Sequence, residues 1–200
     1  MRQMAKRSAD KKTQPGRLRI VAGNWRSRLL EIADVPGLRP TSERIRETLF
    51  NWLAPCLAGA RCLDLFAGSG ALGLEALSRG AASCVFVENS ARAAMALRSN
   101  IATLDAGGAD LHEIDAIEYL QGQDKVKFDI VFLDPPFAAV KQVDLCRLLG
   151  ERSLLADNAR IYIEEDRSTP AIVLPEGWQT LRTKNAGNVR YSLVNSGATA

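Results

Sequence analysis

The sequence contains a single histidine, His112, and no Cys-x-x-Cys pair. Zinc sites and serine-type triads need histidine beside further ligands or a nucleophile, so neither kind of site is expected. The spacing of the cysteines also gives no sign of a disulfide framework. We expect them to be free, buried thiols in a reducing, cytoplasmic environment; they are Cys56, Cys62, Cys84 and Cys146.

The sequence also lacks a long apolar run. No segment reaches the ~20 residues that a membrane-spanning helix needs, and residues 1–17 are polar and basic, which argues against a secretory signal. The chain has 200 residues, of which 46% are hydrophobic and 24% charged, as is typical of one globular domain with an appendage. We therefore expect no membrane partner.

Positive charge is concentrated near the N-terminus. Residues 1–46 carry twelve Lys or Arg and four Asp or Glu, whereas residues 47–200 carry fourteen and nineteen. A basic N-terminal part on an acidic body indicates a polyanionic partner, such as RNA, that the N-terminal part contacts. Residues 1–16 are expected to form a basic, flexible tail.

Residues 18–22 and 25–30 flank Gly23-Asn24, which predicts a β-hairpin with a two-residue turn. Alternate residues of a strand share a face, so arginines in and beside these strands can line one surface. The candidate phosphate contacts are Arg17, Arg19, Arg26 and Arg28, with Arg39 in the linker at 35–40.

A helix is predicted after this linker. Thr41 or Ser42 caps it, and we expect it to extend to about Leu53 and to be ended by Pro55. The hairpin and this helix, residues 17–55, are predicted to form an RNA-binding extension of the main domain at 56–200.

In the main domain, apolar strand patterns alternate with helical patterns. Strands are predicted at 62–66, 84–87, 109–114, 128–133 and 160–164, and helices at 71–79, 91–104, 116–120 and 140–149. Two further strands, 178–183 and 189–194, have no room for a crossover helix between them and are expected to pair antiparallel. The fold class is therefore α/β, a Rossmann-like, mostly parallel seven-stranded sheet with an antiparallel C-terminal hairpin.

The most informative segment is Asp134-Pro135-Pro136-Phe137. The two prolines end the strand at 128–133, because proline donates no ladder hydrogen bond. A carboxylate, carbonyl groups free of the ladder and an aromatic ring thus lie at the carboxyl end of a strand. Oxygen acceptors with a stacking ring suit a planar amine, such as a nucleobase with an exocyclic NH₂ group.

A second motif, Gly68-x-Gly70-x-x-Gly73, occupies the first strand-to-helix turn, shortly after Asp64. It matches the dinucleotide-binding fingerprint, whose glycines allow close approach of a ligand and of the helix. Glu88, at the end of the next strand, is placed to bind ribose hydroxyls. A nicotinamide-dependent oxidoreductase also fits this motif, and so does an ordinary tight turn.

Other features favour S-adenosylmethionine (SAM) over a nicotinamide. His112 is badly placed for hydride chemistry, and no Tyr-x-x-x-Lys pair is present. Asp64 would repel a pyrophosphate but attract the cationic amino group of SAM. The antiparallel final hairpin is also typical of SAM-dependent methyltransferases.

With these motifs the chain closely resembles the RsmD family, which methylates N2 of a guanine in bacterial 16S rRNA. The matching segments are 20–26, 38–51, 63–80, 86–88, 115–116, 128–137 and 184–189, and only residues 1–16 lie outside the resemblance. It implies a class I methyltransferase domain at 56–200, SAM as the cofactor, and 16S rRNA or the small ribosomal subunit as the partner. It also implies a monomer without a metal.

The resemblance and the chemistry together assign site residues. The catalytic set is Asp134, Pro135, Pro136 and Phe137. The cofactor-binding set is Asp64, Phe66, Ala67, Gly68, Ser69, Gly70, Glu88, Asn89, Asp115, Ala116 and Thr41. In it, Glu88 would accept from the ribose and Asp115 from the adenine amino group, although Asp115 also suits the N-cap of the next helix.

Two other functions stay open. An adenine-N6 DNA methyltransferase is possible because Asp-Pro-Pro-aromatic segments also serve that amine, although the chain lacks a large target-recognition domain. A non-catalytic RNA-binding module that keeps a Rossmann-like fold is the other, against which the intact Asp134 and glycine motif argue.

Overall fold

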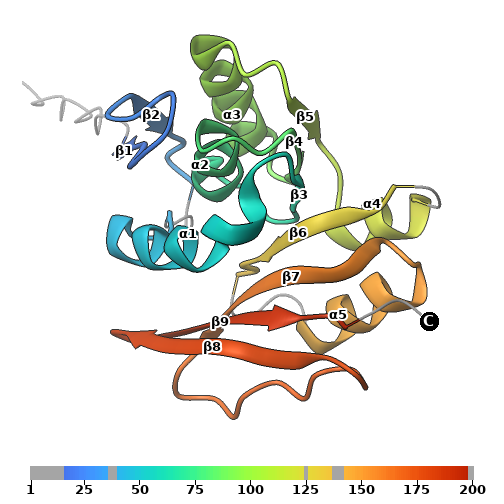
Figure 1. Ribbon diagram of the computed structural model, residues 1–200. Helices are drawn as coiled ribbons and strands as arrows, with labels where there is room; N and C mark the ends of the chain where they lie inside the picture. Colours follow the sequence, from blue (N-terminus) through green and yellow to red (C-terminus); the bar gives the residue numbers. More distant parts are fainter. Residues whose placement is uncertain (1–15, 36–39, 124–125, 137–141, 198–200) are drawn as a thin grey trace, which may run out of the picture.

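The computed structural model describes residues 16–35, 40–123, 126–136 and 142–197, and Figure 1 shows their arrangement. The predicted tail at 1–16 lies outside these residues except for Gly16. The helices are α1 (Glu43–Leu57), α2 (Ala71–Ser78), α3 (Ala91–Leu104), α4 (Ala116–Gly122) and α5 (Gln142–Glu151). The strands are β1 (Gly16–Arg19), β2 (Leu29–Ile32), β3 (Arg61–Asp64), β4 (Ser83–Val87), β5 (Ala109–His112), β6 (Phe128–Leu133), β7 (Leu155–Asp166), β8 (Gln179–Ala186) and β9 (Val189–Asn195).

Seven strands form the main sheet in the order β5-β4-β3-β6-β7-β9-β8. The strands from β5 to β7 are parallel, and β9 pairs antiparallel with both β7 and β8. This confirms the predicted Rossmann-like sheet and its C-terminal hairpin. β3 lies between β4 and β6, so the connections that follow β3 run to opposite sides of it. In open α/β sheets, such a reversal of strand order leaves a crevice for ligands at the carboxyl ends of the strands.

Helices cover both faces of the sheet (Figure 1). One apolar cluster joins α1, α2 and α3 to the face that carries Cys62, Phe86 and Phe132. The second cluster joins α4 and α5 to the opposite face, which carries Leu63 and Val131. Side chains alternate between the two faces along a strand. Asp64, Asp134 and Glu164 each come two positions after a residue of the first cluster, so they belong to the face that α1 covers.

The N-terminal hairpin forms, but its predicted two-residue turn is wrong. β1 and β2 pair with Arg17 opposite Glu31 and Arg19 opposite Leu29, which leaves a loop from 20 to 28. The loop bends onto α2, where the Asn24 N–H donates to the Ser78 carbonyl at 2.7 Å. Gly23 is required there, because a Cβ on it would lie 1.9 Å from that carbonyl oxygen. Tertiary contacts with α2 therefore replace the turn that the local sequence favours.

Several element ends also differ from the predictions. α1 starts after the Ser42 cap as expected but continues through Pro55 to Leu57. Proline removes one hydrogen bond of the last turn, and the burial of Leu53 and Leu57 on either side of it keeps that turn helical. β7 is much longer than the predicted 160–164, since Leu155 pairs with Phe128 of β6 at one end and Glu165 and Asp166 pair with β9 at the other. β8 and β9 are joined by Gly187 and Asn188 alone.

The cysteines follow the prediction with one exception. Cys62, Cys84 and Cys146 are free and buried, but Cys56 is exposed near the end of α1. No helix in the described part of the chain is long and apolar enough to cross a bilayer.

Candidate active site

The carboxyl ends of β3 and β6 bring the two predicted motifs together. The two strands are parallel neighbours, with Leu63 opposite Val131 and Asp64 opposite Phe132. Asp134 follows β6 directly, so the Asp64 carboxyl and the Asp134 carboxyl project from adjacent strands on the α1 side of the sheet. This position is the crevice at which the strand order diverges.

Asp64 is held between β3 and the start of α2. Its side chain is buried, and its Oδ2 accepts a hydrogen bond from the Gly73 N–H at 3.0 Å. Burial raises the pKa of Asp64 to about 7, partly opposed by the Gly73 hydrogen bond and reinforced by the charge of Glu88. A cation beside such a buried carboxyl would stabilise its ionised form.

The glycine motif is mainly a device for close packing. Gly68 and Gly70 have positive φ angles of 52° and 79°, which side chains rarely adopt. A Cβ on Gly70 would lie 2.5 Å from the Leu97 side chain, and a Cβ on Gly73 would lie 2.2 Å from the ring of Phe86. Gly73 therefore lets α2 approach the sheet, as predicted, and the space above Gly70 is filled by leucine side chains instead of being left for a ligand.

Glu88 fixes the turn that follows β3. Its Oε2 accepts from the Gly68 N–H at 2.8 Å, and its Oε1 accepts from the Ser90 N–H at 2.7 Å. A carboxylate has about four acceptor positions, so each oxygen can take one further donor. Glu88 is half-buried and the neighbouring Asn89 is exposed, which makes both accessible from the crevice side of the turn.

The remaining predicted cofactor residues lie on the same edge. Asp115 caps α4 through Oδ1, which accepts from the N–H groups of Ile117 and Glu118 at 2.8 and 3.3 Å. Its side chain is exposed, whereas Ala116 is buried. In the turn after β3, Ala67 and Ser69 are buried and Phe66 is half-buried.

Asp134 combines partial exposure with a hydrogen bond across the crevice. The Thr41 hydroxyl, just before α1, donates to Asp134 Oδ2 at 3.3 Å. Burial, together with the charges of Glu164 and Asp64, raises the pKa of Asp134 well above its usual value. Pro135 is buried and Pro136 is exposed. Phe137 lies outside the described residues, so its predicted stacking stays a prediction.

Sequence reasoning missed Glu164, which the structure places beside Asp134. Leu133 is opposite Ile163 in the β6–β7 ladder, so the two acids follow at the same level. Glu164 is buried, and its Oε1 accepts from the Tyr162 hydroxyl at 2.5 Å. The sequence signal for it was an acid directly after the apolar strand residues Ile161, Tyr162 and Ile163. An acid is rarely buried in such a position without a role.

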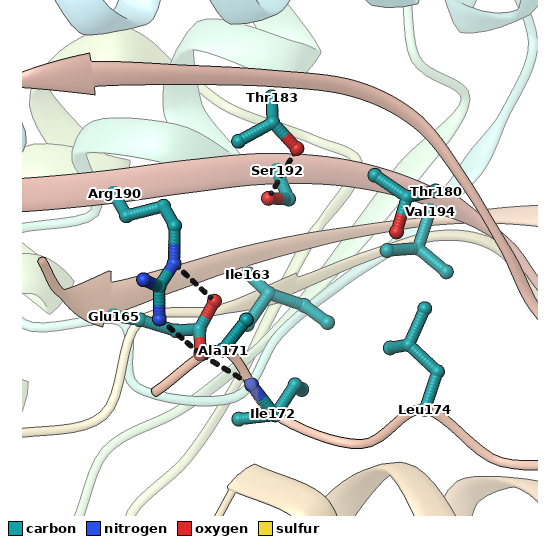
Figure 2. A pocket seen from close by; sticks show the side chains of 10 residues that line it. All are labelled: Ile163, Glu165, Ala171, Ile172, Leu174, Thr180, Thr183, Arg190, Ser192 and Val194. Carbon is teal, nitrogen blue, oxygen red and sulfur yellow. Dashed lines mark hydrogen bonds and ion pairs between the residues drawn. The ribbon is translucent and has the colours of Figure 1, made fainter. Parts of the chain in front are cut away.

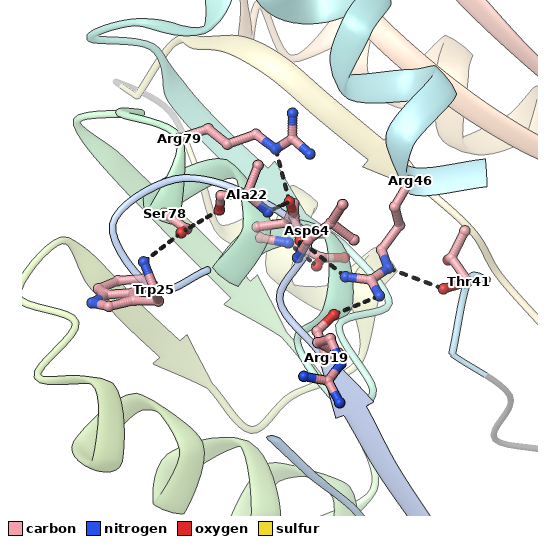
Figure 3. A network of polar contacts seen from close by, with 11 residues as sticks. Arg19, Ala22, Trp25, Thr41, Arg46, Asp64, Ser78 and Arg79 are labelled. Carbon is pink, nitrogen blue, oxygen red and sulfur yellow. Dashed lines mark hydrogen bonds and ion pairs between the residues drawn. The ribbon is translucent and has the colours of Figure 1, made fainter. Parts of the chain in front are cut away.

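A second missed group ties the N-terminal hairpin to the domain (Figure 3). Glu75, wholly buried on α2, accepts from the N–H groups of Val21 and Ala22 at 2.8 and 3.0 Å. It also pairs with Arg46 at 3.0 Å and with Arg79 at 2.7 Å. Four donors therefore satisfy one buried carboxylate, which offsets the cost of removing it from water.

Arg46, also wholly buried, links the hairpin to the crevice. In addition to Glu75, its guanidinium donates to the backbone carbonyl of Arg19 at 2.8 Å and to that of Thr41 at 3.2 Å (Figure 3). Burial lowers the pKa of Arg46, opposed by the charge of Glu75. This guanidinium thus fixes the backbone of the residue whose hydroxyl contacts Asp134.

The predicted RNA-contacting arginines are solvent-exposed where the structure describes them. Arg17, Arg19, Arg26 and Arg28 are all exposed. The Arg28 guanidinium also donates to the Thr103 carbonyl of α3 at 3.0 Å, which anchors the hairpin to that helix. Arg39 lies outside the described residues.

A small cavity of about 110 Å³ lies away from the crevice, between β7, β8, β9 and the segment after β7 (Figure 2). Its charged members are paired: Arg190 binds Glu165 at 3.1 Å, and Glu165 accepts from the Ile172 N–H at 2.8 Å. These contacts fasten the segment to the sheet. None of the predicted site residues lines this cavity. Within the described ranges, no group of three or more His, Cys, Asp or Glu side chains is arranged to hold a metal ion.

Comparison with known proteins gives consistent matches over nearly the whole chain. The family model described as "Conserved hypothetical protein 95" matches residues 18–195. The ribosomal RNA small subunit methyltransferase D of Escherichia coli strain K12 is 47% identical over 178 residues, which cover 89% of each chain. The solved structure of yhhF from Escherichia coli has a TM-score of 0.85 at 43% identity and covers 92% of this chain and 99% of that one.

A more distant structure bears on the fold. It is an RNA methyltransferase from Salinibacter ruber in complex with S-adenosyl-L-homocysteine, with a TM-score of 0.60 at 16% identity, covering 80% of this chain and 94% of that chain. A likeness at this level of identity shows that the two proteins share the fold.

Proposed function

The chain belongs to the family of ribosomal RNA small subunit methyltransferase D, the RsmD family, and on that premise we propose that it methylates the exocyclic N2 amine of a guanine in 16S rRNA. It is a SAM-dependent rRNA methyltransferase. The observation that carries the proposal is the pair of carboxyl groups, Asp64 and Asp134, on adjacent strand ends in the crevice.

The residues of the crevice suit the cofactor. When bound, SAM supplies an electrophilic methyl group on a positively charged sulfur. Asp64 is a buried carboxyl that lacks a cationic partner among its described contacts, and it would hold the cationic methionine part. Glu88 and Asp115 each keep acceptor capacity for ribose hydroxyls and the adenine amino group.

The amine needs acceptors because its lone pair is delocalised into the guanine ring. We propose that the Asp134 carboxylate and the Pro135 carbonyl each accept one N–H of that amine. Both hydrogen bonds favour a tetrahedral nitrogen, so the lone pair becomes available to attack the methyl carbon. Holding the two reactants in this geometry can contribute ~7–11 kcal/mol to the barrier reduction. Phe137 would stack on the base, a contact worth about 1–3 kcal/mol.

Cofactor affinity is expected to depend on pH through Asp64. The pKa of Asp64, about 7, means that its carboxyl takes up a proton below that pH. A cation binds better to the ionised form, so SAM affinity should fall as pH drops below 7, by up to about tenfold per unit. Titration calorimetry between pH 5.5 and 8.5 measures this.

The matched variant for this prediction is Asp64→Asn, which should bind SAM more weakly and lose the part of the pH dependence centred near 7. In the protein without SAM, ionisation of Asp64 is unfavourable to folding, whereas it is favourable to SAM binding. Because the folded pKa lies above the unfolded value of about 3.9, Asp64 makes the free wild-type protein less stable as pH rises from about 4 to 7. An unchanged pH dependence of binding in Asp64→Asn would remove Asp64 from the cofactor site.

We further propose that the exposed arginines of the N-terminal extension hold the RNA backbone. If all five predicted contacts meet phosphates, the slope of log affinity against log salt should be about −3.5, from ~0.7 per contact on a single strand. Replacing Arg17, Arg19 and Arg26 by glutamine should reduce this slope by about 2 units. Arg147→Gln, an exposed change on α5, is the control and should leave it unchanged. A salt-independent affinity would contradict this role.

The narrower assignments are part of the same proposal. We infer that the substrate is 16S rRNA or the small ribosomal subunit, that the protein acts as a monomer in the cytoplasm, and that residues 17–55 form the RNA-binding extension of a methyltransferase domain at 56–200. The resemblance to the RsmD family supports these inferences, and the charge distribution supports the extension.

The test is transfer of tritiated methyl groups from SAM to three candidate substrates: small ribosomal subunits, deproteinised rRNA and duplex DNA. Label in the small subunit or its rRNA, with none in DNA, is the expected result. Label in DNA alone would favour the adenine-N6 alternative, which the Asp-Pro-Pro-Phe segment also suits. Failure to bind SAM at all would favour a non-catalytic RNA-binding module.

A further inference from the structure

Glu164 is an acid with no part in the proposed chemistry, although it lies on the strand next to Asp134. It follows Ile163 on β7 as Asp134 follows Leu133 on β6, so the two carboxyl groups occupy neighbouring strands at the same level. Glu164 is 4% exposed. Two negative charges so close in a buried site are unfavourable, and such pairs commonly retain a proton.

The hydrogen bonds around the pair limit where protons can lie. The Thr41 hydroxyl oxygen lies 3.3 Å from Asp134 Oδ2, and hydrogen bonding to the same hydroxyl lowers the pKa of Glu164. A hydroxyl has only one proton to donate. With both acids ionised, one of them would face a Thr41 lone pair without a proton between them. With Asp134 protonated, its O–H donates to the Thr41 oxygen over the 3.3 Å contact, and the Thr41 proton can be donated to Glu164.

The surroundings of the pair favour a single negative charge. Tyr162 donates to Glu164, and burial raises the pKa of Tyr162 well above its usual value, so it remains a donor. Tyr191 of β9 lies opposite Glu164 in the ladder, and Asp64 adds a further negative charge from β3. Burial raises the pKa of Glu164, while its hydrogen bonds with Tyr162 and Thr41 oppose the rise.

We propose that Asp134 and Glu164 hold one proton between them through the Thr41 hydroxyl, and that Glu164 is the positioning residue that takes this proton when the amine arrives. In the free protein Asp134 carries the proton, because Glu164 has the additional donor Tyr162. When an amine N–H approaches Asp134, the Asp134 proton passes to the Thr41 oxygen and the Thr41 proton passes to Glu164. Asp134 is then ionised without a second anion beside it.

This inference rests on the proposed function and explains how charge is balanced during transfer. The amine nitrogen bonds to the methyl carbon, the carbon–sulfur electron pair stays on sulfur, and the surplus amine proton passes to Asp134. The carboxyl pair thus loses its one negative charge as the sulfur loses its positive charge. A pair with two negative charges would instead stabilise the cation before the reaction and oppose its loss.

The experiment is a carbon-13 NMR titration of the carboxyl groups of the free, full-length protein, which needs neither SAM nor RNA. In the wild type, Asp134 and Glu164 should respond together in two separated steps, as coupled groups do. In Glu164→Gln, Asp134 should titrate in one step shifted to lower pH by about one unit or more. The control is Glu165→Gln, a buried acid of the same strand on the opposite face, which should leave the titration of Asp134 unchanged.

The reaction provides a second readout. The acidic limb of the kcat/KM profile of Glu164→Gln should move to lower pH together with the NMR step. Independent titration of the two acids in the wild type, or an unshifted Asp134 in Glu164→Gln, would overturn the proposal. If the two acids titrate as a coupled pair but the protein does not methylate rRNA, the shared proton is supported and the proposed function is rejected.

A second pair of variants keeps the proposal testable if Glu164→Gln does not fold. Thr41→Val removes the linking hydroxyl, which stabilises the pair when it holds one proton, so the loss of the shared proton should move to lower pH. Thr41→Ser keeps the hydroxyl and should leave this step in place. Equal titration of Asp134 in the two variants would overturn the linking role of Thr41.

Discussion

Asp134→Ala is expected to bind SAM with near wild-type affinity and to lose about 10²- to 10³-fold in turnover, the range found when one preorganised polar group is removed from a reacting centre. In the proposed mechanism the carboxyl accepts from the amine, whereas the proposed cofactor contacts, Asp64, Glu88 and Asp115, lie at or beyond the ends of other strands. Calorimetry of SAM binding beside a methyl-transfer assay separates the two effects.

The matched control for this prediction is Asp129→Ala on the same strand. Asp129 is half-buried at the opposite end of β6 and pairs with the exposed Arg61 at 3.0 Å. Its removal should leave turnover within about twofold of wild type, since exposed ion pairs contribute only ~0–1 kcal/mol. If Asp134→Ala kept near-normal turnover, the mechanism in which Asp134 accepts a hydrogen bond from the amine would be wrong.

Glu75→Ala is expected to lower the free energy of unfolding by about 3–5 kcal/mol, because it leaves the buried Arg46 guanidinium without its charged partner. It also removes the acceptor for the N–H groups of Val21 and Ala22. For a chain of this size the midpoint of thermal unfolding should fall by roughly 10 °C. Denaturant unfolding followed by circular dichroism measures the change.

The control variant is Arg61→Ala, which breaks the exposed pair with Asp129 and should cost at most about 1 kcal/mol. A loss in Glu75→Ala no larger than in this control would show that the buried network does not hold the extension in place. Because Arg46 also fixes Thr41 and the hairpin, Glu75→Ala should weaken RNA binding as well.

The sequence predicts the elements of this fold best where local signals coincide. α3 has the predicted limits because Ser90 caps it and its apolar residues recur at helical spacing. β6 ends at Leu133 because two prolines follow Asp134. The turn of the N-terminal hairpin could not be predicted in this way, since its loop is shaped by hydrogen bonds to α2.

The same distinction applies to the site. Asp64 and Asp134 could be predicted because Asp64 is the last residue of a strand, Asp134 follows one, and each lies beside a recognisable turn. Glu164, Arg46 and Glu75 were missed because their roles depend on which strands and helices become neighbours. The long pairing of β7 with β6 and β9, which brings Glu164 beside Asp134, is a tertiary outcome with no local pattern in the sequence.

The most direct measurement is the identity of the methylated nucleoside. Small subunits from cells that lack the protein are incubated with it and labelled SAM, and the rRNA is digested and separated by mass spectrometry. The proposed grip of oxygen acceptors on an exocyclic guanine amine predicts N2-methylguanosine at one position, formed far more slowly when Asp134→Ala replaces the wild type. Methyl groups on a base carbon, on a ribose or on adenine would contradict the account.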